Sequence, residues 1–234
     1  KPRWSDKRDY DFLKSRLLGT AASPSEYEEF NIDLGFQMMN QNAMGLPFGC
    51  TGMAQADLCS NEDGVIYDPA DVYDRTPPGG RDRGRDMRAS LSVICKTGVR
   101  EYLTTNPPSN PRKGYFSIRS QGLLDWFDAL YISVLSTLNE KRGISIGIPW
   151  FSEWNHIEPD GVLPVPIFDV SKAGWHNAVI ARGKFINGKY YLGIKSWQGH
   201  DYGDNGWCYM SKELANVVFE INGKNVFGKM KYES

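Results

Sequence analysis

Trp175-His176 precedes two further stretches in the second half of this chain, Lys195-Ser196-Trp197-Gln198-Gly199 and Tyr202-Gly203-Asp204-Asn205-Gly206-Trp207. The histidine opens an apolar strand, and a second strand then ends in a turn rich in tryptophan and glycine. Upstream, Gln41 is followed by Gly49-Cys50-Thr51-Gly52-Met53-Ala54 at the head of an expected helix. A cysteine ahead of a histidine supplies the two groups that thiol-based nucleophilic catalysis requires.

The hydrophobic pattern changes along the chain at Gly143. Helical spacing of apolar residues precedes it, and short strands with Gly/Asp turns follow it. The expected helices lie at about residues 50–59, 86–96 and 123–138, and the expected strands at residues 30–36, 144–148, 177–181, 189–195 and 206–210. Residues 60–85 are predicted to be a long loop, and residues 104–114 a crossover between lobes. A helical first half and a β-rich second half indicate an α+β protein.

Length and charge restrict the class of protein. The 234 residues suit one unit, which we expect to divide into a helical lobe, 1–115, and a β-rich lobe, 116–234. A net charge of −1 gives no field for nucleic acid or an anionic membrane. The Arg/Asp run at residues 80–88 alternates in sign and is predicted to be a solvated loop. No apolar stretch approaches the roughly 18 residues of a membrane span. The first residues carry no signal-peptide core, but a chain from which a leader or pro-segment had been removed would begin in the same way, so the sequence leaves the compartment open.

The four cysteines are Cys50, Cys59, Cys95 and Cys208. None has CxxC spacing, so zinc and redox sites have little support and no metal is expected. If Cys50 is a nucleophile, the remaining three cannot all pair with one another. Mostly unpaired thiols are therefore expected, and they favour a reducing compartment.

Cys50 follows Pro47-Phe48-Gly49 and opens an expected helix. Backbone N–H groups and the positive end of that helix would stabilise a thiolate there. The alternative is a buried core cysteine. Among the histidines His156, His176 and His200, only His176 begins an expected strand, which suits a base that must be held rigidly.

The order of these motifs resembles the papain-like cysteine peptidases. The matching features are an Asp-Leu strand at Asp33-Leu34, a glutamine loop at Gln41, the nucleophile turn at Cys50 and the strand start at His176. The resemblance covers about residues 30–215. It implies a helical lobe packed on a β-rich lobe, with the active-site cleft between them. The loop from Gln41 to Cys50 is longer than the common form, and an extra residue before Gly183 leaves the histidine register open by one.

The resemblance also implies roles. Cys50 is the nucleophile, His176 is its base, and the Gln41 amide with the Cys50 N–H holds the oxyanion. The resemblance is to a bacterial or viral-type variant of the family, and this chain lacks the family's orienting asparagine. Ser196 stands at that position in one alignment and Lys195 in another. Ser196→Asn is accordingly expected to preserve or raise activity.

The resemblance therefore predicts a cysteine peptidase that cleaves peptide or protein amide bonds through a thiolate–imidazolium pair and an acyl-enzyme. It implies no cofactor, no nucleic acid and no membrane. The alternative is a weakly active or inactive papain-like fold that serves in binding or assembly with a protein partner. The replaced asparagine and the seven tryptophans support that alternative.

Overall fold

The computed structural model describes residues 10–11, 24–32, 39–78, 84–112, 114–118, 125–135, 143–166, 173–221 and 227–231. The helices are α1 (Cys50–Asp63), α2 (Pro69–Arg75), α3 (Met87–Thr97), α4 (Trp126–Leu135), α5 (Lys212–Ile221) and the short 3-10 helix η2 (Ser152–Asn155). The strands are β1 (Tyr10–Asp11), β2 (Phe30–Asn31), β3 (Gly114–Ile118), β4 (Ile144–Trp150), β5 (Gly174–Ile186), β6 (Lys189–Lys195), β7 (Trp207–Ser211) and β8 (Phe227–Lys231).

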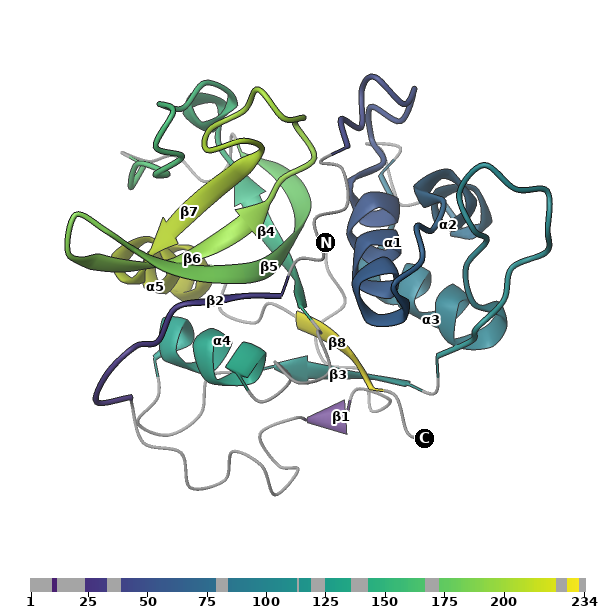
Figure 1. Cartoon of the computed structure of the whole chain (residues 1–234), viewed down its shortest axis with the longest axis horizontal. Helices are drawn as coiled ribbons and strands as arrows, with labels where there is room; N and C mark the ends of the chain where they lie inside the picture. Colours follow the sequence, from purple (N-terminus) through teal and green to yellow (C-terminus); the bar gives the residue numbers. More distant parts are fainter. Residues whose placement is uncertain are drawn as a thin grey trace.

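Helices and sheet occupy different parts of the molecule. Helices α1, α2 and α3 pack together beside the sheet, while α4 and α5 pack on each other and on strands (Figure 1). Helix α1 also packs against β5, which begins near α1 and runs away from it to the β5–β6 hairpin. The expected fold class is confirmed: helices dominate the N-terminal part and an antiparallel sheet the C-terminal part.

The sheet has the order β1-β3-β8-β4-β5-β6-β7, with β2 paired to β5. Strands β4 and β5 are antiparallel, and their register sets Ile148 opposite His176. Trp150 lies two residues beyond Ile148, so its side chain emerges from the same face of the sheet. Strand β5 continues well past the expected residues 177–181 and crosses a register shift between Ile180 and Arg182.

Helix α1 is longer than the expected residues 50–59. It ends where Gly64 adopts a left-handed conformation with φ of 70°. A Cβ atom at Gly52 would lie 2.5 Å from the Pro69 carbonyl oxygen. Glycine inside this helix therefore permits the close approach of α2, which offsets its low helix propensity.

The prediction that residues 60–85 form one loop is wrong. Helix α2 lies within them, and Asp68 caps it by accepting a hydrogen bond from the Ala70 N–H at 2.9 Å. Pro69 at the first helical position supplies a start signal that the Pro/Asp-rich composition obscured. Residues 79–83, which include the first four residues of the Arg/Asp run at 80–88, lie outside the described residues.

The other expected elements compare closely. Helix α3 begins one residue after its cap, Asp86, and α4 occupies the central part of the predicted residues 123–138, whose ends lie outside the described residues. Strand β6 has the expected bounds, and β4 and β7 extend slightly beyond theirs. Helix α5 was not expected in the β-rich half. Of the predicted strand at residues 30–36, residues 33–36, and with them Asp33-Leu34, fall outside the described part.

Candidate active site

Cys50 is the first residue of α1, and Gly49 precedes it as the cap residue. The Gly49 N–H donates to the Leu46 carbonyl oxygen at 2.8 Å, which closes the turn before the helix. A Cβ atom at Gly49 would lie 2.6 Å from the Leu46 Cβ, so this turn requires glycine. The local sequence thus places the Cys50 thiol at the N-terminal end of α1.

His176 lies two residues into β5 and is only 8% exposed. Its ring nitrogen Nε2 lies 2.9 Å from the main-chain carbonyl oxygen of Ser196. A carbonyl oxygen only accepts hydrogen bonds, so Nε2 must carry the proton. In the neutral ring, Nδ1 is then left with a free lone pair, which is the form that a general base needs.

Asn177 follows His176 and connects the site to its surroundings. A hydrogen bond from its backbone reaches the Cys50 thiol. Its own carbonyl oxygen accepts from the Trp197 indole N–H at 2.9 Å, and its side-chain oxygen accepts from the Ser145 hydroxyl at 2.8 Å. Because the Cys50 thiol touches the residue next to His176, the structure brings the predicted nucleophile and base into one site.

Burial acts on both groups in the direction of neutrality. It raises the pKa of the Cys50 thiol, and the hydrogen bond from Asn177 opposes this only in part. It lowers the pKa of His176 to about 4, against a smaller opposite effect of the Ser196 carbonyl. Desolvation therefore opposes the thiolate expected at the helix end and the imidazolium expected at His176, and favours the neutral form of both groups.

Neither candidate for the orienting position presents its side chain to His176. The Ser196 side chain is fully buried beside the Cys208 thiol, whose pKa burial raises to about 12, and its hydroxyl oxygen is among the buried atoms that form no hydrogen bond in the described part of the chain. The Lys195 amine binds the Asp57 carboxylate at 2.8 Å and so faces α1. What orients the histidine ring is the backbone at Ser196.

Gln41 is buried in the loop before α1. Its N–H donates to the Trp197 carbonyl oxygen at 3.0 Å, and the neighbouring Asn40 amide donates to the Gln198 carbonyl oxygen at 2.7 Å. The loop is thereby fastened to the turn after β6. The Gln41 side-chain amide lies 3.4 Å from the Pro47 carbonyl oxygen, a long contact that leaves its second N–H available.

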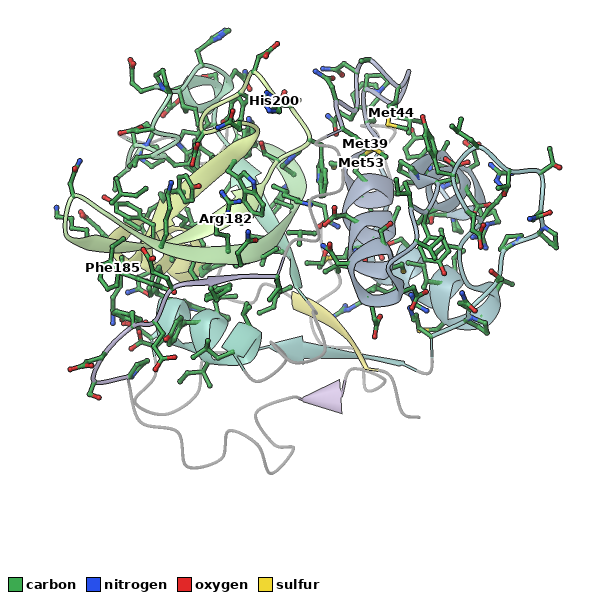
Figure 2. All side chains as sticks on the ribbon, in the orientation of Figure 1. Met39, Met44, Met53, Arg182, Phe185 and His200 are labelled. Carbon is green, nitrogen blue, oxygen red and sulfur yellow. The ribbon has the colours of Figure 1, made fainter. Side chains whose placement is uncertain are left out.

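The remaining candidates lie elsewhere. His156 and His200 are exposed, and Figure 2 shows His200 on the loop after β6. The same view groups Met39, Met44 and Met53 around the N-terminal end of α1. Cys59 and Cys208 are buried, and all four cysteines are free thiols, as expected.

Two residues of the site were missed from the sequence. Trp150 lies with its ring centroid 4.6 Å from that of His176, and Asn177 forms the contacts given above. A tryptophan at the end of an apolar strand and an asparagine within one were the available signals, because both depart from the expected apolar pattern.

The described residues form neither a metal-binding cluster nor a membrane-spanning helix. No group of three or more His, Cys, Asp or Glu side chains in that part of the chain is placed to hold a metal ion. Among the helices of the same residues, none is long and apolar enough to cross a membrane.

The fold is that of the papain-like cysteine proteases. Xylellain, a cysteine protease from Xylella fastidiosa, matches with a TM-score of 0.70 and 16% identity over 100% of this chain and 95% of its own. Bromelain from Ananas comosus, in complex with the E64 inhibitor, matches with 0.64 and 16% over 89% and 100%. Procathepsin B from Trypanosoma congolense matches with 0.69 and 11% over 98% and 86%. No protein-family model matches the chain, and no significant relative is found among curated proteins.

Proposed function

We propose that this protein hydrolyses peptide or amide bonds with Cys50 as nucleophile and His176 as base. The observation that carries the proposal is the Nε2 contact of His176 with the Ser196 carbonyl oxygen at 2.9 Å. It fixes the tautomer in which Nδ1 accepts a proton, while the backbone of the next residue binds the Cys50 thiol. A backbone acceptor thus performs the orienting task for which the chain offers no asparagine side chain.

The reaction begins from neutral groups. As the Cys50 sulfur attacks the scissile carbonyl carbon, its proton passes to Nδ1 of His176. The imidazolium then gives that proton to the leaving amine, and the C–N bond breaks to form an acyl-enzyme. Water attacks the thioester, His176 takes its proton, and the acid product leaves as the Cys50 thiol is restored.

Gln41 and the Cys50 N–H are proposed to hold the oxyanion. The first N–H groups of α1 have no partner within the helix, and Gln41 is held by the backbone of Trp197. One such donor typically contributes about 10²–10³ in kcat. To donate to the oxyanion, the Gln41 amide either uses its second N–H or breaks its hydrogen bond to the Pro47 carbonyl oxygen.

Exposed aromatic side chains support a peptide substrate. Phe48 lies two residues before Cys50 and is 47% exposed, and Trp175 directly precedes His176 and is 53% exposed. Apolar side chains beside a reactive pair are suited to contact residues that flank a scissile bond. A single unit of two lobes, 1–115 and 116–234, with the substrate between them, is part of this proposal.

The test uses a thiol-reactive inhibitor and a peptide library together. E64, which is bound in the bromelain structure, is expected to modify Cys50 alone, as read by peptide mass mapping, and to stop hydrolysis of a mixed peptide–fluorophore panel. Cys50→Ala is expected to lose both signals, and Cys59→Ala, which removes a buried thiol, neither. Hydrolysis that survives in Cys50→Ala disproves the mechanism.

The second candidate is a papain-like fold used for binding or assembly. The raised pKa of Cys50, the lowered pKa of His176 and the contact of Gln41 with Pro47 favour it. It is supported if the native chain folds stably, binds peptides and yet neither reacts with E64 nor cleaves the panel.

A further inference from the structure

The indole of Trp150 packs against the His176 ring in a tilted arrangement. The ring centroids are 4.6 Å apart, and the planes are inclined by 51°. The two residues come from adjacent antiparallel strands, with His176 opposite Ile148. Because the contact joins the ends of β4 and β5, it does not depend on the turn that carries Ser196.

Trp150 is itself held in place. Its indole N–H donates to the Asn155 side-chain oxygen at 2.9 Å, and its ring meets that of Trp154 edge-on at 5.5 Å. Trp154 is fully buried and donates its own N–H to the Pro164 carbonyl oxygen at 3.0 Å. An indole with both a hydrogen bond and a packed neighbour has little rotational freedom, so it is a rigid surface for the histidine.

We infer that Trp150 is a positioning residue, which fixes the plane of the His176 imidazole and keeps water from its hydrogen bond to the Ser196 backbone. The catalytic role of Trp150 rests on the proposed function, whereas the contact between the two rings does not depend on it. With the Ser196 carbonyl at Nε2 and the indole packed against the ring, the imidazole is held at two places and Nδ1 stays directed away from the Ser196 oxygen. A single hydrogen bond to a backbone oxygen leaves rotation about that bond open, and the indole removes this freedom.

The first measurement is made on the free protein by NMR of the histidine rings. Trp150→Leu is expected to admit water, to raise the His176 pKa from about 4 toward its ordinary value and to speed solvent exchange of the Nε2–H proton. Trp150→Phe keeps an aromatic face and is expected to titrate close to the native chain. His156 and His200, which are exposed, serve as internal references.

The matched control is Trp126→Leu. Trp126 is half-buried and packs on Phe219 with centroids 5.6 Å apart, so its loss removes an indole from a different helix contact. This variant is expected to leave the His176 titration and Nε2–H exchange unchanged. Where Trp150→Leu fails to fold, Trp150→Met takes its place with the same expected changes, because it also removes the aromatic ring beside His176.

The second measurement is hydrolysis of the peptide that the native chain cleaves best. Loss of orientation in Trp150→Leu is expected to lower kcat/KM by about tenfold or more, mainly through kcat, with recovery in Trp150→Phe. An unchanged His176 titration and Nε2–H exchange in a folded Trp150→Leu overturn the inference. Changed ring properties in a chain that hydrolyses no peptide would support Trp150 as a positioning residue while refuting the proposed function.

Discussion

Nε2 of His176 lies 2.9 Å from the main-chain oxygen of Ser196, while the Ser196 side chain faces Cys208 on the neighbouring strand. The backbone of Ser196 therefore orients the histidine, whereas the sequence had suggested the Ser196 side chain for this role. A backbone acceptor is insensitive to the side chain at its position. This finding changes what substitutions at Ser196 are expected to do.

Ser196→Ala is expected to retain activity near the native value, because the carbonyl oxygen that binds His176 remains. Peptide hydrolysis and E64 modification of Cys50 measure this directly. A loss comparable to that of a His176 variant would show that the hydroxyl, and not the backbone, serves the histidine.

Ser196→Asn is expected to lower stability, which reverses the expectation from the sequence. Ser196 is fully buried, and a larger side chain there costs about 1–3 kcal/mol by overpacking. Urea unfolding of Ser196→Asn beside Ser196→Ala measures the difference. A more active and equally stable asparagine variant would restore the original expectation.

His176 is expected to make the fold sensitive to acid. Its folded pKa of about 4 lies below that of an unfolded histidine, about 6.5, so acid protonates the unfolded chain first. The contribution of the buried neutral imidazole to the free energy of unfolding is complete above about pH 6.5. It is lost as the pH falls toward 4, and the whole loss is about 3 kcal/mol at most. His176→Gln is expected to unfold with a weaker pH dependence between about pH 7 and about pH 4.5 than the native chain, while exposed His156→Gln behaves as native. Equal pH dependence in all three contradicts the buried neutral imidazole.

Asn177→Ala is expected to destabilise the fold by about 1–3 kcal/mol, since it removes the amide acceptor of the buried Ser145 hydroxyl and leaves it the weaker Met87 sulfur at 3.3 Å. Gln55 on α1 also donates to Ser145, at 3.0 Å, so the loss extends to the contact between α1 and the sheet. A double-mutant cycle with Ser145→Ala measures the coupling, and strict additivity would show that the two residues do not act as one network.

Lys195 and Asp57 form a buried ion pair. We expect the single variant Asp57→Leu to be much less stable than a double variant in which both charges are removed. The amine is 1% exposed and the carboxylate 10%, and they join β6 to α1. Asp57→Leu alone is expected to cost about 3–5 kcal/mol, because it removes the carboxylate that binds a buried amine. Asp57→Leu with Lys195→Met is expected to recover most of that loss in the denaturation midpoint. A double variant as unstable as the single one would show that the charges themselves are required.

The sequence by itself determined much of the fold. Apolar periodicity located α1, α3, α4, β4 and β6, because burial of one face imposes a repeat that single residues reveal. The order of Gln41, Cys50 and His176 led to the papain-like fold that the solved structures show. Helix α2 was missed, since a helix of one or two turns that depends on a cap and on packing has too few residues for a periodic signal.

The tertiary structure alone decided how the candidate site is assembled. Every residue has the same main-chain carbonyl group, so the amino-acid sequence does not predict that the Ser196 carbonyl oxygen contacts His176. The contact of Trp150 with His176 depends on the register of two strands separated by more than twenty residues. Burial, which favours the neutral form of Cys50 and of His176, depends on all the residues packed around them. Sequence names the reactive groups, but strand register and desolvation, which depend on long-range packing, determine their protonation and orientation.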